Sequence, residues 1–236
     1  MELTEQTARD DVKVRRIAAK AAIATVGLLA VAGLSACRVE SGAAVFVQDQ
    51  RIAETQVDAV VDSAPEAFGN DIGPIRQWTV SSFAVVELAR QYAADNGTAL
   101  PGPDYAGVAE AAGGESAFTR LYAEQAAYGQ TLFTEATAVQ PTEADVADLR
   151  IGTFSQINAS LDAEQAAYVE EAISQAATGE AFSQSLGKRD LLNSLFAEYD
   201  VVANPRYGAP TVTVAQVAVA PQVAYSVTVP LPTTAS

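Results

Sequence analysis

Ala43-Ala44-Val45-Phe46-Val47 is a short apolar run, and the polar residues Gln48-Asp49-Gln50 and the pair Arg51-Ile52 follow it directly. An apolar run of this length that ends at polar residues is typical of a strand and a turn. Residues 43–52 therefore predict a strand, a turn and a short returning strand. Residues 200–203 again have strand character, and the turn formers of residues 204–208 end that segment.

Between these two segments the apolar residues recur at helical spacing. Val57, Val60 and Val61 fall on one face of a helix over residues 54–62, and Pro65 ends it. The other helices that we expect cover residues 75–94, 116–139, 162–177 and 180–198, with at most one short helix in 101–114 and another after Thr142. The predicted fold class is mainly α.

Two of these helix starts have a local signal. Thr142 stands three residues before Asp145, and Asp162 stands three residues before Gln165. In such a capping box each side chain bonds the backbone N–H of the other residue, which satisfies donors that the first turn leaves free. The spacing therefore predicts that helices begin directly after Thr142 and at about Asp162.

The C-terminal segment, residues 209–236, has no charged residue and is rich in Val, Ala, Thr and Pro. Alternation of valines over residues 212–219 is compatible with an edge strand. Pro210, Pro221, Pro230 and Pro232 favour instead an extended, partly disordered tail, because proline cannot donate to a strand ladder. We therefore expect the folded domain to cover residues 43–208, with the tail outside it.

Leu34-Ser35-Ala36-Cys37 is a lipobox, and it ends an N-terminal segment that is first basic and then apolar. We expect residues 1–36 to be a lipoprotein signal peptide and residues 37–42 to be a tether. The Cys37 thiolate would take diacylglycerol as a thioether, together with fatty acids such as palmitate, and this lipid would be the membrane contact. The expected location is the cell membrane, facing outside the cytoplasm.

Two other interpretations of this segment are a transmembrane anchor and a buried structural cysteine. The uncharged stretch covers only residues 21–36, whereas a bilayer-spanning helix needs about 20 residues. The basic residues before it and the small residues before Cys37 favour the signal peptide.

The composition excludes several classes of function. The formal net charge is −15, from 29 acidic and 14 basic residues, so nucleic acid is not an expected partner. The chain has no histidine, and Cys37 is its only cysteine, so the usual catalytic bases, nucleophiles and zinc ligands are missing. We expect no enzyme activity, no cofactor and no metal.

Lys188 is the only lysine after Cys37. A lysine base would therefore have to be Lys188, but a solvated charge on a helix is its more ordinary role. Acidic pairs such as Glu170-Glu171 and Asp145 with Asp148 are likewise expected to keep the surface soluble rather than to act as acid and base.

The order of these elements resembles the N-terminal domain of SurA-type chaperones. The likeness covers about residues 43 to 208, where it rests on the first strand, the helix with Val57 and Val60, the short helix after Thr142, and the late strand at residues 201–203. The lipobox and the short tether before residue 43 also fit it. The chain is similar most of all to actinobacterial lipoproteins that contain that domain. The resemblance implies a helical body with a two-stranded ribbon that pairs residues 45–47 with residues 201–203.

Isomerase members of that family insert a parvulin domain before the late strand, and this chain does not. Only two predicted helices separate Arg150 from Asp200, and no histidine is present for a parvulin-type site. Prolyl isomerase activity is therefore not implied.

The resemblance implies a groove between helices that holds unfolded polypeptide. The candidate wall residues are Trp78, Phe83, Tyr92, Phe118 and Tyr122, with Tyr128 and Phe133 in addition. Aromatic residues at helical spacing are more often core. The first functional hypothesis is a membrane-anchored holdase for unfolded or secreted polypeptides. The alternative is a structural or adaptor lipoprotein that docks one folded partner.

Overall fold

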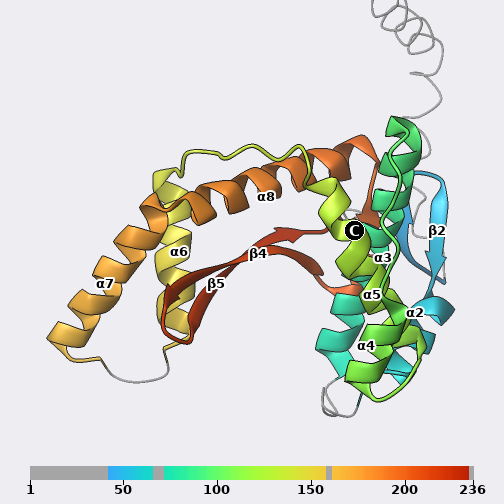
Figure 1. Cartoon of the computed structure of the whole chain (residues 1–236), viewed down its shortest axis with the longest axis horizontal. Helices are drawn as coiled ribbons and strands as arrows, with labels where there is room; N and C mark the ends of the chain where they lie inside the picture. The colour runs from blue at the N-terminus through green and yellow to red at the C-terminus, as the bar shows by residue number, and fades with distance from the viewer. Residues whose placement is uncertain (1–41, 66–71, 158–160, 234–236) are drawn as a thin grey trace, which may run out of the picture. The chain divides into compact units, whose positions relative to one another are not determined.

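The computed structural model describes residues 42–65, 72–157 and 161–233, which belong to one compact unit, Gly42–Ser236 (Figure 1). The lipobox residues Leu34, Ser35, Ala36 and Cys37, the signal peptide and all of the tether except Gly42 lie outside the described residues. None of the helices that the structure describes is long and apolar enough to cross a bilayer.

The first strand, β1 (Ala43–Val47), is the centre of a small antiparallel sheet in the order β2-β1-β3. On one side β1 pairs with β2 (Gln50–Ala53), and on the other with β3 (Val202–Ala203), where Phe46 lies opposite Val202. The predicted pairing of the two ends of the domain is confirmed, but the returning strand β2 joins the same sheet, so it has three strands and not two.

The helix after this sheet, α2 (Glu54–Asp62), has the predicted bounds and buries Val57, Val60 and Val61. The long helix α3 (Ile72–Asn96) follows and packs against α2, β1 and α5. Along α3 the residues Val80, Ala84 and Leu88 are fully buried. This periodic apolar face explains why a helix forms here, and it makes α3 the central helix of the N-terminal half.

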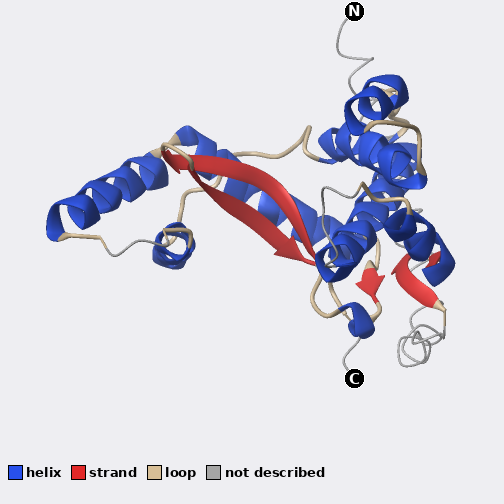
Figure 2. Ribbon diagram, turned by 90° about the horizontal axis from the view of Figure 1, so that it is seen from below, coloured by secondary structure: helices blue, strands red, loops and turns tan. Residues whose placement is uncertain are grey.

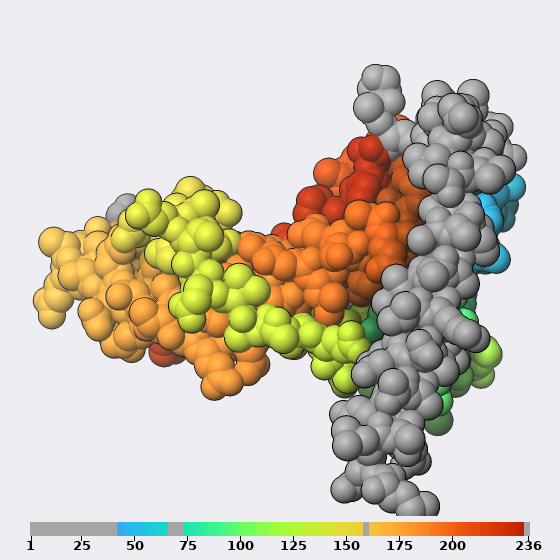
Figure 3. Space-filling model, turned by 90° about the horizontal axis from the view of Figure 1, so that it is seen from above, coloured from blue at the N-terminus to red at the C-terminus, as the bar shows by residue number. Residues whose placement is uncertain are grey.

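The predicted long helix over residues 116–139 is shorter in the structure. One short helix, α4 (Tyr105–Ala112), precedes α5 (Ala117–Leu132), and α5 ends at Leu132. Residues 133–142 then run without helical structure along the outside of α8, as Figures 1 and 3 both show. We call residues 133–142 the strap.

A tertiary contact explains why α5 stops. The backbone N–H of Val139 donates to the carbonyl of Ser183 over 3.0 Å, so the strap is bonded to α8 at this point. Gly187 of α8 has no side chain, and a Cβ there would overlap the backbone carbonyl oxygen of Thr137. The close approach of the strap to α8 therefore depends on a residue about 50 positions away along the chain, which local spacing does not reveal.

Three helices form the other half: α6 (Glu143–Ser155), α7 (Ala163–Thr178) and α8 (Glu180–Glu198). Both predicted capping boxes are present. The Thr142 hydroxyl accepts from the N–H of Asp145 over 3.2 Å, and the Asp162 carboxylate accepts from the N–H of Gln165 over 2.9 Å. The starts of α6 and α7 are therefore set locally, as the sequence predicts.

The C-terminal segment differs most from expectation. Residues 211–230 form an ordered antiparallel hairpin of β4 (Thr211–Ala220) and β5 (Val223–Pro230) rather than a partly disordered tail. The compact unit accordingly continues past residue 208. The hairpin contacts α3, α6, α7 and α8, and Figures 1 and 2 show it lying alongside α8. Its alternating valines are buried in these contacts: Val212, Val214, Val217, Val227 and Val229.

The four prolines do not oppose this hairpin, because of where they stand. Pro221 lies in the turn, Pro230 ends β5, and Pro210 and Pro232 lie just outside the strands. Proline is tolerated at such positions because no ladder hydrogen bond is lost there. The carbonyl of Pro232 even accepts from the N–H of Ala203 over 2.7 Å, which ties the end of the chain to the first sheet.

Candidate functional site

Three of the candidate aromatic residues lie together. The Trp78 ring of α3 lies 4.8 Å from the Phe118 ring and 6.2 Å from the Tyr122 ring of α5, between ring centroids. Phe118 is buried, Trp78 is half-buried and Tyr122 is 48% exposed. The cluster packs against Val60 of α2, so most of it serves as core and Tyr122 provides its exposed rim.

The other two candidates lie elsewhere. Phe83 is half-buried between the apolar clusters of the molecule. Tyr92 is about 21 Å from Trp78 along the axis of α3, at 1.5 Å per residue, and burial together with the nearby Glu135 and Glu198 raises its pKa. The structure therefore does not bring the five residues Trp78, Phe83, Tyr92, Phe118 and Tyr122 to one groove.

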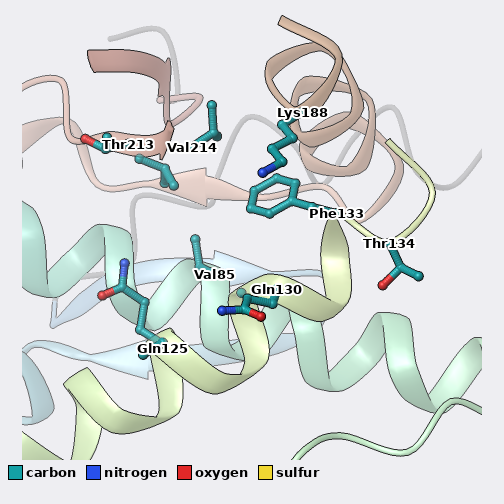
Figure 4. A pocket seen from close by; sticks show the side chains of 11 residues that line it. Val85, Gln125, Gln130, Phe133, Thr134, Lys188, Thr213 and Val214 are labelled. Carbon is teal, nitrogen blue, oxygen red and sulfur yellow. The ribbon is translucent and has the colours of Figure 1, made fainter. Parts of the chain in front are cut away.

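A pocket of about 460 Å³ lies between α3, α5, α8 and β4 (Figure 4). Its apolar walls include Val85 of α3, Phe133 at the end of α5 and Val214 of β4, and its polar residues include Gln125 and Lys188. This volume is within the range of about 300–1,000 Å³ that is usual for ligand sites. Of the aromatic residues named from the sequence, only Phe133 lines this pocket.

β4 borders this pocket with its edge. The residues Val212, Thr213 and Val214 all line the pocket, although successive side chains of a strand point to opposite faces. The edge of the strand, rather than one of its two faces, therefore borders the pocket at these three residues. Among the described residues β4 has one strand partner, β5, so its other edge has no strand beside it.

Lys188 is the one charged residue among the described residues that line the pocket. Its ammonium lies 5.7 Å from the centre of the Phe133 ring, and Figure 4 shows it reaching from α8 toward that ring. No carboxylate within the described part of the chain lies at ion-pair distance from it. Lys188 is therefore a half-buried helix residue that faces a pocket, and the expectation of a solvated charge stays a prediction.

Gln125 is hydrogen-bonded to its neighbour on α3. The buried Ser82 hydroxyl donates to Oε1 of Gln125 over 3.2 Å. The Nε2 donors of the same amide have no hydrogen-bond partner among the described residues. Because the oxygen is already used, the amide presents its donor side to the pocket, as drawn in Figure 4.

The residue after Lys188 connects α8 to α6. Arg189 forms an ion pair with Asp145 of α6, with 2.5 Å between Nη1 and Oδ1. Burial alone would raise the pKa of Asp145, but hydrogen bonds from Thr142 and Arg189 outweigh it and lower that pKa. Asp145 is therefore a buried structural carboxylate, and the expectation that it lies on the soluble surface is wrong.

The sequence contains two signals for this site, although it does not connect them. Lys188 is the only lysine after Cys37 in a strongly acidic chain, and Val212 and Val214 alternate with threonines. Both were visible, but only the tertiary structure shows that they meet. Within the described residues no group of three His, Cys, Asp or Glu is placed to hold a metal ion.

Comparison of the chain with family models, with curated proteins and with solved structures finds no match. The resemblance to the SurA-type domain therefore has no support beyond the order of the elements.

Proposed function

We propose that this protein is a membrane-anchored lipoprotein, facing outside the cytoplasm, whose domain holds extended polypeptide segments without catalysis. The observation that carries the proposal is the pocket along the unpaired edge of β4. The lipobox supplies the anchor, and Cys37 would carry the lipid. The site differs from the aromatic groove expected from the sequence, although the class of ligand is the same.

An unpaired strand edge is suited to unfolded chains because it binds backbone rather than a particular sequence. An extended segment adds to such an edge through main-chain hydrogen bonds, and every second side chain of the segment then points toward the same face. The apolar walls of Val85, Phe133 and Val214 would receive those side chains. Backbone binding together with a small apolar pocket gives the broad specificity that a holdase needs.

Filling the pocket tests this proposal. Ala126 is an exposed residue of α5 that lines the pocket, so Ala126→Phe adds bulk there without displacing the core. We expect at least about a tenfold loss of affinity for labelled unfolded peptides by fluorescence anisotropy, and a matching loss of protection of an aggregating client. The control is Ala147→Phe, at an exposed position of α6 outside the pocket, which should change neither.

Equal binding by the two variants and the unchanged chain would contradict the proposal. The adaptor alternative predicts a different pattern: one folded partner recovered at fixed stoichiometry, with no affinity for unfolded peptides. Its support in the structure is exposed apolar side chains away from the pocket, Ile151 at 68% and Tyr168 at 63% exposed.

A further inference from the structure

The pocket combines free hydrogen-bond donors with one positive charge. Lys188 supplies the ammonium, and the amide of Gln125 turns its Nε2 donors inward because Ser82 occupies its oxygen. The hydroxyl of Thr213 also belongs to the lining, whereas that of Thr134, another lining residue, already donates to the carbonyl of Thr131 over 3.0 Å. Lys188 is half-buried and has no carboxylate partner among the described residues, so its charge is open to an anion from outside.

The ammonium of Lys188 and the amide donors of Gln125 together suit a carboxylate ligand. A charged ammonium and neutral N–H donors bind a carboxylate through charge-assisted hydrogen bonds, which are stronger where the surroundings are apolar. Here the surroundings are Val85, Val214 and the Phe133 ring, over which the ammonium already lies at 5.7 Å. A bulkier or more highly charged anion would need further cations, and the described lining has only Lys188.

The edge of β4 indicates what kind of molecule carries the carboxylate. A segment that adds to this edge passes Val212, Thr213 and Val214, which line the same pocket as Lys188. We propose that the pocket recognises the free C-terminal carboxylate of an extended polypeptide, with Lys188 and Gln125 binding the carboxylate and the apolar walls receiving the last side chain. This inference rests on the proposed function, and it names the class of segment that the site prefers.

A pair of synthetic peptides tests the inference on the full chain. Both are acetylated peptides of about six residues, the usual length of a strand, with alternating threonine and valine and valine last. One ends in a free carboxylate and the other in an amide. We expect the carboxylate peptide to bind at least about tenfold more tightly, because the amide removes the charge that Lys188 pairs with.

Two variants test whether Lys188 causes the difference in affinity between the two peptides. Lys188→Met keeps the length of the side chain but removes the charge, and it should weaken only the carboxylate peptide, to the affinity of the amide peptide. Unchanged binding of the amide peptide shows that the variant is folded with its site intact. Arg150→Met removes the same charge from an exposed ion pair with Glu170 on the α6–α7 side, and it should leave the tenfold preference in place.

The outcomes separate the two proposals. Equal binding of the carboxylate and amide peptides by the unchanged chain overturns the C-terminal specificity and leaves the holdase standing. Binding of neither peptide overturns both. Binding of acetylvaline alone as tightly as the carboxylate peptide overturns the role of the β4 edge, because a single residue makes no strand contacts.

Discussion

At the scale of single residues, Asp145 links three parts of the fold. Its carboxylate caps α6 by accepting from the N–H of Thr142 over 2.8 Å, and it pairs with Arg189 of α8. Because Arg189 follows Lys188, this ion pair also holds the segment of α8 from which Lys188 reaches the pocket. A residue that looks like surface charge in the sequence is therefore a buried support of the candidate site.

We predict that Asp145→Asn lowers the free energy of unfolding by about 2 kcal/mol at neutral pH, since it removes the negative charge of a buried ion pair and of the hydrogen bonds to Thr142. The pKa of Asp145 is lowered in the folded state, so its stabilisation is complete above the ordinary value of 3.8 and is lost as the pH falls through the folded pKa. The difference between the variant and the unchanged chain should therefore shrink below pH 3.8.

Denaturant unfolding at a series of pH values measures this difference. Asp148→Asn, at an exposed position of the same helix, is the matched control and should change stability by less than about 0.5 kcal/mol. A deficit for Asp145→Asn that stays constant from neutral to acid pH would show that its charge contributes nothing.

At the scale of elements, the hairpin of β4 and β5 is part of the core and not an appendage. Val229 is 0% exposed, whereas its neighbour Thr228 faces outward on the same strand. We predict that Val229→Ala costs about 2 kcal/mol, from two lost methylene equivalents and the cavity that they leave. Thr228→Ala should cost less than about 0.5 kcal/mol.

Thermal or denaturant unfolding of the two alanine variants checks this prediction. A partly disordered tail, as the prolines suggest, would make both substitutions equally harmless. If Thr228→Ala also lowered the free energy of unfolding strongly, the two faces of β5 would not differ in burial.

The elements that the sequence predicts well are those with local signals. The capping boxes at Thr142 and Asp162 and the valines of α2 depend only on nearby residues, and their helices begin where expected. The end of α5 and the hairpin depend on contacts distant in sequence, as between Thr137 and Gly187. The candidate pocket is missed for the same reason, because Lys188 and Val214 meet only in the folded chain.

At the scale of the whole molecule, the first sheet joins the beginning and the end of the helical part. Phe46 and Val202 lie opposite each other in the antiparallel pair of β1 and β3. We predict that a chain with Phe46→Cys and Val202→Cys forms a disulfide under mild oxidation, seen as a mobility shift without reductant. Phe46→Cys combined with Thr228→Cys, which belongs to the other sheet, should not crosslink.

No crosslink at Phe46 and Val202, or in the registers beside them, would contradict the pairing. The pairing is important for the site as well, because the carbonyl of Pro232 bonds Ala203 of the same sheet and thereby holds the end of the hairpin. The sheet that closes the domain is thus linked to the end of the hairpin.

The binding of extended polypeptide along the edge of β4 can be tested by amide hydrogen exchange of the full chain, with and without a saturating unfolded peptide. We expect slower exchange in β4, over residues 211–217, and around Lys188, with little change in α6 and α7. Unchanged exchange in β4, with protection only near Trp78, Phe118 and Tyr122, would contradict it and return the binding site to the aromatic cluster.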